Sequence, residues 1–278
     1  FALWKLAKLG EPFWESPWGD GRPGWHIECS AMSLNHFGEQ FDIHGGGHDL
    51  RFPHHEAEIF QSECCTGCEP VVGYWMHNGF VNVDGEKMSK SLGNFWTVRE
   101  AFEDHAPLAL RYALLSVPYR NPIDLTPEFL QDAVIHYERL VEAYSASLSS
   151  DSDSGVDLSD YSQRLTDAMN DDFNTRAAII EIQAVVSQNP GRDVASWFEK
   201  YAGDVLGLLP SSAEVLAGRA EAESARADIA DRVEGLLKER ETARQTKNWD
   251  RADEIRDELN SIGVIVEDGP DGPTWRLA

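Results

Sequence analysis

Hydrophobic and polar positions divide the chain into two regions with different patterns. Up to about residue 100, short apolar runs alternate with Gly, Trp and His, and one of them, Gln40–Ile43, is followed by His44 and three glycines. This pattern predicts a short buried strand whose end lets a ligand approach the backbone, as in open α/β sheets. Beyond residue 100, apolar residues recur near the 3.6-residue period, which predicts helices.

Several local signals mark where elements begin. Pro53 suits the first turn of a helix that carries His54 and Glu58. Residues Thr97–Glu100 have a capping-box pattern, and Thr126 precedes a long amphipathic helix. An Asp-Gly turn at the end of an extended segment, residues 79–85, precedes Lys87. Further helices are predicted at 158–170, 174–187, 194–208, 220–246 and 249–261, and two short strands at 264–267 and 274–277.

These elements predict an α/β fold in four parts. Residues 1–100 form the C-terminal part of a catalytic domain, and residues 101–148 form a helical connector. Residues 149–245 begin with an acidic Ser/Asp linker and form a helical bundle. Residues 246–278 form a small α/β tail. Because the chain opens inside an apparent domain and without Met, we expect a missing segment before Phe1.

Charge narrows the classes of partner. The chain has 48 acidic against 24 basic residues, for a net charge of −24. Acidity of this size disfavours non-specific binding to nucleic acid, so an RNA partner would be held by shape and by a few local Lys and Arg side chains. Adaptation to high intracellular salt is a further hypothesis, because salt shortens the range of the self-repulsion. No apolar run is long enough to span a bilayer, so we expect no membrane partner.

Four cysteines raise the question of a metal. His54 and Glu58 are four residues apart and share a helical face, so with Cys29 they could bind Zn²⁺. The alternative, a buried His bonded to a carboxylate with Cys29 filling the core, has about equal weight. Cys64, Cys65 and Cys68 have no second paired motif, and we interpret them as a flexible loop. The cysteine count does not suit a disulfide framework and favours an intracellular protein.

Three further features suggest substrate contacts. The segment Lys87–Ser91, Lys-Met-Ser-Lys-Ser, is a cationic loop suited to a leaving pyrophosphate. Trp25 lies four residues before Cys29 and could wall a small pocket, although core packing would explain it as well. His44 and Asp49 flank three glycines and could donate or accept hydrogen bonds to a nucleotide or an amino acid.

Taken together, these segments resemble the cysteinyl-tRNA synthetases, a class I family. The resemblance rests on residues 24–32, 41–47, 49–50, 52–56, 58–59, 74–77 and 86–94, and on residues 251–259 with Gly263 and residues 274–276. It implies a Rossmann-like catalytic domain followed by a helical bundle and an anticodon-binding tail. It implies ATP with Mg²⁺, L-cysteine and tRNA as substrates, in a cytoplasmic monomer.

The resemblance also implies roles for individual residues. Cys29, His54 and Glu58 match three zinc ligands, and a fourth ligand, a Cys, is expected upstream of Phe1. Trp25 and His44 match residues that line the cysteine pocket, and the zinc would select the substrate thiolate. Lys87 and Lys90 are the catalytic candidates, and Lys90, His44 and Asp49 are the candidates for ATP binding. His48 has no assigned role.

Two rival interpretations stay open. The cysteine ligase of mycothiol synthesis is similar through the core and also uses ATP and zinc, but it has no use for an anticodon-binding tail. Residues 211–278 therefore argue against it. A non-catalytic zinc and tRNA-binding module is the other rival. The second ATP motif of the family is not found in residues 1–278, so this chain by itself is expected to be inactive.

Overall fold

A computed structural model describes residues 2–83, 85–89, 93–94, 96–246, 248–261, 264–269 and 272–277. For residues 222–231, 245, 250, 260–261, 265–269 and 272–277 it describes the backbone only. The chain separates into two compact units, Phe1–Leu209 and Pro210–Ala278. Among the described residues, no helix has the length and apolar character that a membrane crossing requires.

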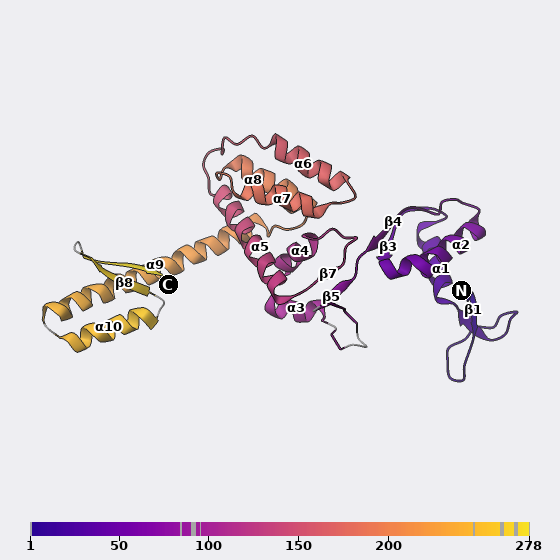
Figure 1. Ribbon diagram of the computed structural model, residues 1–278, viewed down its shortest axis with the longest axis horizontal. Helices are drawn as coiled ribbons and strands as arrows, with labels where there is room; N and C mark the ends of the chain where they lie inside the picture. Colours follow the sequence, from indigo (N-terminus) through magenta and orange to yellow (C-terminus); the bar gives the residue numbers. More distant parts are fainter. Residues whose placement is uncertain are drawn as a thin grey trace. The chain divides into compact units, whose positions relative to one another are not determined.

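The first unit begins with a small α/β segment, drawn in indigo in Figure 1. Strand β1 (Trp4–Leu6) pairs antiparallel with β2 (Gly21–Pro23), and helix α1 (Trp25–Phe37) follows directly. Strand β3 (Phe41–Gly47) pairs in parallel with β4 (Val72–Asn78). Because parallel neighbours need a crossover connection, the chain between them carries helices. These are the short turns η1 (His48–Leu50) and η2 (Arg51–His55) and helix α2 (Glu56–Thr66).

The strand predicted at residues 40–43 is present as β3, but it is longer than its apolar run. The prediction that it is buried is wrong, because every residue of Phe41–Gly47 is half-buried or exposed. His44–Gly47 continue β3 and pair with Trp75–Asn78 instead of forming a loop after the strand. Gly46 shows why glycine belongs there, since a Cβ at this position would lie 2.9 Å from Cε1 of His55. The glycines therefore let the His55 ring approach the strand.

The next elements hold the Lys87 segment. Strands β6 (Glu86–Lys87), β5 (Val81–Val83) and β7 (Ile123–Asp124) form one sheet in that order. Helix α3 (Val98–Asp104) begins with the predicted capping box, in which Thr97 accepts from the Glu100 backbone and Glu100 accepts from the Thr97 backbone. Helix α4 (Pro107–Leu115) follows. Lys90, Ser91 and Leu92 lie outside the described residues.

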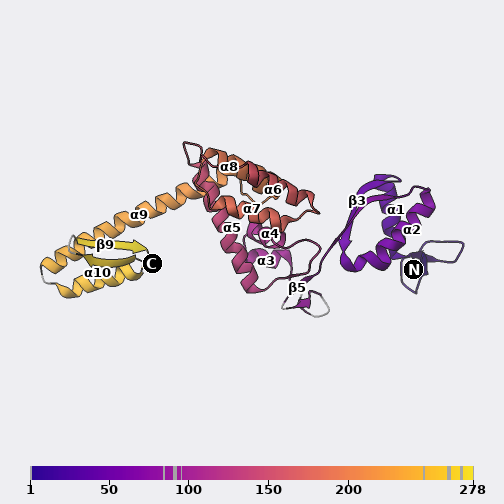
Figure 2. The ribbon, with the colours of Figure 1, turned by 45° about the horizontal axis from the view of Figure 1, so that its top comes forward.

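Helices complete the first unit. They are α5 (Pro127–Leu148), α6 (Ser159–Asn170), α7 (Thr175–Val186) and α8 (Arg192–Phe198), which continues as η3 (Glu199–Val205). Figure 2 shows α6, α7 and α8 gathered beside α5. Their apolar faces meet in a core that includes Leu140, Leu165, Ile182 and Phe198, each nearly inaccessible to solvent.

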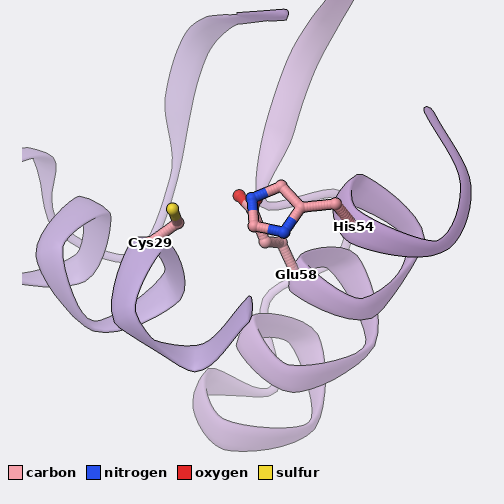
Figure 3. A group of neighbouring side chains, drawn as sticks. All are labelled: Cys29, His54 and Glu58. Atoms are coloured by element: carbon pink, nitrogen blue, oxygen red, sulfur yellow. The ribbon is translucent and has the colours of Figure 1, made fainter. Parts of the chain in front are cut away.

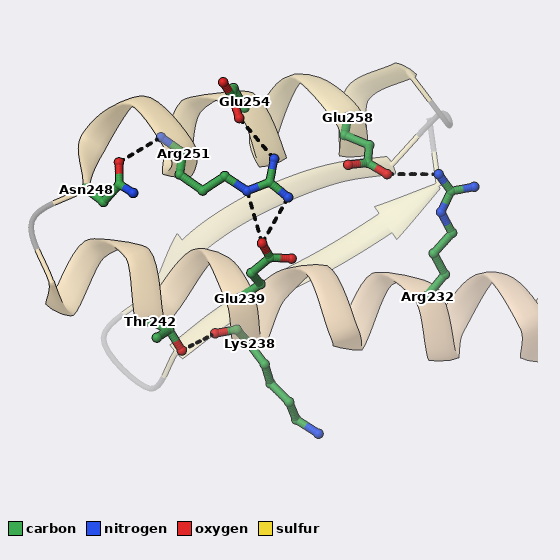
Figure 4. Close-up of polar contacts among 8 residues, drawn as sticks. All are labelled: Arg232, Lys238, Glu239, Thr242, Asn248, Arg251, Glu254 and Glu258. Carbon is green, nitrogen blue, oxygen red and sulfur yellow. Dashed lines mark hydrogen bonds and ion pairs between the residues drawn. The ribbon is translucent and has the colours of Figure 1, made fainter.

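The second unit is a helical hairpin with a two-stranded sheet. Helix α9 (Ser212–Gln245) packs on α10 (Trp249–Ser261), and β8 (Val264–Gly269) pairs antiparallel with β9 (Gly272–Leu277). Val233, Ile255, Leu259 and Val264 form its buried core. Figure 4 shows the Arg251 guanidinium between Glu239 and Glu254, which ties the two helices together at the surface.

Helix α9 starts earlier than the predicted residue 220, because Ser211 and Glu214 form a capping box that the apolar periodicity did not reveal. It groups with the tail rather than with the bundle helices. The four-part functional division drawn from the sequence stays a prediction.

Candidate metal and substrate site

The three proposed metal ligands come together from two helical segments. Cys29 lies in the second turn of α1, while His54 is the residue before the end of η2 and Glu58 lies one turn later in α2. One ligand atom from each lies within 4.8 Å of the others. Figure 3 shows the Cys29 thiol on its own helix, across from the His54 ring and the Glu58 carboxylate. His54 and Glu58 are 4% exposed, so the group is nearly dry on that side.

The Glu58 carboxylate shows whether these residues suit a cation. Its Oε1 lies 2.7 Å from Nε2 of His54, and its Oε2 lies 3.2 Å from Nε2 of His44. Despite the short contact, Oε1 is buried and accepts no aligned hydrogen bond from the described residues. Buried polar atoms are rarely left without a partner. A cation shared by thiol, imidazole and carboxylate would satisfy this oxygen, and these donors suit Zn²⁺.

Burial controls the protonation of the group. It raises the pKa of Glu58 to about 7. It also raises the pKa of the Cys29 thiol, with help from the negative charges of Glu58 and Glu28. Burial lowers the pKa of His54, and the neighbouring His26 and His44 lower it further. A neutral imidazole is the form that binds metal, whereas the thiol and carboxyl would release protons as a metal binds.

A network of histidines that the sequence did not single out surrounds these ligands. Nδ1 of His26 lies 2.6 Å from Nδ1 of His54, and Nδ1 of His55 lies 2.8 Å from Nε2 of His77. His44, His55 and Glu58 form a second group with metal-ligand spacing. Both groups use Glu58, whose Oε1 faces His54 and whose Oε2 faces His44. The alternation of Trp75 and His77 in a strand was an available signal, because it puts both on one face.

The proposed substrate residues lie around this group. The Trp25 ring stacks on His54, with centroids 4.0 Å apart, and remains 54% exposed. A ring that covers a ligand while still facing solvent can wall a small pocket. Burial and then His77 lower the pKa of His44, which is therefore neutral near pH 7 and contacts Glu58.

The catalytic candidate Lys87 and the ATP-binding candidate Asp49 meet in an ion pair. Nζ of Lys87 lies 3.1 Å from Oδ2 of Asp49 and 4.0 Å from the centre of the Phe80 ring. The hydrogen bond from Lys87 lowers the pKa of Asp49, so the Asp49 carboxylate is charged near neutral pH. Asn94 closes the segment by accepting from the Ser89 backbone and donating to the Lys87 carbonyl. Lys90, the other lysine of the segment, lies outside the described residues.

Cys64 and Cys65 lie in the last turn of α2, and Cys68 lies just after it, so the loop predicted for these cysteines is wrong for Cys64 and Cys65. Cys64 and Cys65 are exposed. Neither metal-competent group found among the described residues includes any of the three.

Comparisons with known proteins match two separate parts of the chain to family models. Residues 1–135 match the family model for the class I (C) tRNA synthetase catalytic domain. Residues 226–276 match the family model for the cysteinyl-tRNA ligase anticodon binding domain. The second match falls within the second structural unit.

Individual relatives are similar along the whole chain. A cysteine--tRNA ligase from Laribacter hongkongensis is 47% identical over 100% of this chain and 61% of that protein. One from Azotobacter vinelandii is 49% identical over 100% of this chain and 60% of that protein. The chain therefore spans about three fifths of the length of these relatives.

Proposed function

We propose, for a chain that belongs to the cysteinyl-tRNA synthetase family, that the whole protein joins L-cysteine to its cognate tRNA at the expense of ATP. The cysteine carboxylate attacks the α-phosphate of ATP, which forms cysteinyl-adenylate and releases pyrophosphate. A hydroxyl of the terminal ribose of the tRNA then attacks the acyl carbon, and AMP leaves.

The meeting of Cys29, His54 and Glu58, with an unsatisfied carboxylate oxygen at its centre, carries this proposal. A Zn²⁺ bound there would lower the pKa of a substrate thiol and favour cysteine over serine, whose hydroxyl is far less acidic. A site built around such a polar contact can reject an analogue that lacks it by about 10⁴-fold. The fourth ligand would come from outside this chain.

The remaining residues bind and orient the substrates. Trp25 covers His54 and would form one wall of the cysteine pocket, with His44 at its base. The Lys87 ammonium, now paired with Asp49, would turn to the β- and γ-phosphates, and Lys90 would act with it. Asp49, once released, could accept hydrogen bonds from the ATP ribose. These steps need only charge and positioning.

The second unit would bind the anticodon loop. Single-stranded loops expose base edges and faces that proteins can contact. Residues 226–276, the segment that matches an anticodon binding domain, argue against the mycothiol-type cysteine ligase, which acts on an amino sugar. We expect the protein to act as a monomer.

Cysteine-dependent exchange of labelled pyrophosphate into ATP, followed by transfer of labelled cysteine to tRNA, tests the proposal in the whole protein. We expect both activities, and we expect replacement of cysteine by serine to abolish the exchange. Exchange without transfer to tRNA, but with transfer to an amino sugar, would favour the mycothiol-type ligase. Binding of zinc and tRNA without any exchange would favour the non-catalytic module.

A further inference from the structure

A cavity of about 420 Å³ lies beside α2 and the end of β4. Its wall carries His48, Arg51, Glu56, Trp75, His77 and Arg120. None of these side chains belongs to the Cys29, His54 and Glu58 group. The volume lies within the range of small-molecule sites and could hold one nucleotide.

The charge of this wall is opposite to that of the chain. Across the whole sequence, acidic residues outnumber basic ones two to one. On the cavity wall, two guanidinium groups and three imidazoles, including that of His55, face one carboxylate, that of Glu56. A local reversal of this kind attracts an anion that the rest of the surface repels.

Arg51, His48 and Arg120 all lie close enough to the His77 ring to affect its pKa. Burial lowers the pKa of His77, and the charges of Arg51, His48 and Arg120 lower it further. The Arg120 guanidinium is held in place, because its Nη2 donates to Oδ1 of Asp172 over 2.8 Å. Arg51 is exposed and has no ion-pair partner among the residues that the structure describes. Arg51 is thus the group whose charge is still available to a ligand.

We propose that this cavity binds a backbone phosphate of the RNA substrate, with Arg51 as the principal contact. The inference rests on the proposed function, and it assigns to the first unit an RNA contact separate from the anticodon-binding unit. A chain of net charge −24 gains little from general attraction to a polyanion, so local cations must provide its phosphate contacts. Arginine suits the task because its planar fork matches two phosphate oxygens.

The test measures tRNA affinity against salt concentration for the whole protein and its variants. Each phosphate contact contributes about 0.7 to 0.9 to the slope of log K against log salt. We expect Arg51→Gln to weaken binding several-fold and to reduce the slope by about that amount. Arg51→Lys keeps the charge and should keep the slope. Arg99→Gln, at an exposed position on α3 away from the cavity, is the matched control and should change neither.

Zinc content and the KM for ATP in pyrophosphate exchange should stay the same in Arg51→Gln, which shows that the fold and the proposed metal site are intact. An unchanged salt slope would overturn the assignment. So would a raised KM for ATP with an unchanged slope, because the cavity would then bind a free nucleotide. If the unmodified protein charges tRNA while Arg51→Gln keeps its slope, the phosphate site fails and the proposed function stands.

Discussion

At the scale of single residues, the proposed site depends on ionisable side chains whose burial without a partner is unfavourable in free energy. Glu58 is 4% exposed and keeps an oxygen without a hydrogen-bond donor among the described residues. Burial raises the pKa of Glu58 to about 7 and also raises the pKa of Cys29. Both side chains therefore hold their protons more tightly than the same groups would at the protein surface. A divalent cation would reverse both effects, since it stabilises thiolate and carboxylate together.

Cys29→Ser should therefore lower zinc affinity by about 100-fold or more, since even the loss of a supporting contact costs 10- to 100-fold. The KM for cysteine should rise in parallel. Zinc content by mass spectrometry of the native protein and pyrophosphate exchange measure the two effects. Cys65→Ser, at an exposed position outside the group, is the control and should change neither. Full zinc content with normal activity in Cys29→Ser would remove Cys29 from the ligand set.

At the scale of elements, local bonds fix how connections join the helices. The linker between α5 and α6 is tied to α8, because Asp193 accepts from both the backbone and the hydroxyl of Ser154, each over 2.7 Å. Gly191 permits this approach, since a Cβ there would lie 2.2 Å from the Ser154 nitrogen. Burial alone would raise the pKa of Asp193, but these hydrogen bonds outweigh it and lower the pKa.

Asp193→Asn should destabilise the first unit by about 1 kcal/mol at pH 7, the typical net contribution of one hydrogen bond. A lowered folded-state pKa means that the carboxylate stabilises the fold above its unfolded pKa, near 4. That contribution is lost as the pH falls through the folded-state pKa. Urea unfolding at pH 7 and near pH 3 should show that the difference between the two proteins becomes smaller in acid. A difference that is undiminished at low pH would contradict the assigned role of the charge.

The hairpin of α9 and α10 offers a test of how the two units share the function. Leu259 is fully buried between these helices, so Leu259→Ala should destabilise the second unit by about 2–5 kcal/mol. We expect tRNA charging to fall while pyrophosphate exchange persists. Leu216→Ala, on helix α9 of the same unit and 44% exposed, is the control. Equal loss of both activities would count against a separate role for the second unit.

At the scale of the whole molecule, the excess of acid dominates. A net charge of −24 over 278 residues creates self-repulsion that opposes the compact state. The screening length falls from about 10 Å at 0.1 M salt to about 3 Å at 1 M, so concentrated salt should relieve the repulsion. The hypothesis of adaptation to high salt follows from this charge alone.

The urea midpoint of unfolding should therefore rise steeply between about 0.1 M and 1 M KCl. A variant carrying Glu138→Gln, Glu142→Gln and Asp151→Asn removes three exposed negative charges and should show a smaller rise. Equal stability of the unmodified protein at both salt concentrations would remove the hypothesis. This measurement is independent of zinc, ATP and tRNA.

The sequence by itself determined what depends on neighbours along the chain. Capping at Thr97, the helix that begins at Pro127 and the shared face of His54 and Glu58 all follow from spacings of three or four residues. The segments that resemble the synthetase family were likewise recognisable without coordinates. The start of α9 was not recognised, because its apolar period is weak and only its cap marks it.

Only the tertiary structure decided which distant residues meet. The packing of α1 on α2 brings Cys29 to His54 and sets His26 against the same ring. The parallel register of β3 and β4, together with the crossover through α2, places His55 beside His77. The Arg51 and Arg120 cavity likewise joins segments about 70 residues apart. The physical reason is that such contacts depend on how whole elements pack, whereas sequence periodicity fixes only the direction of each side chain within its own element.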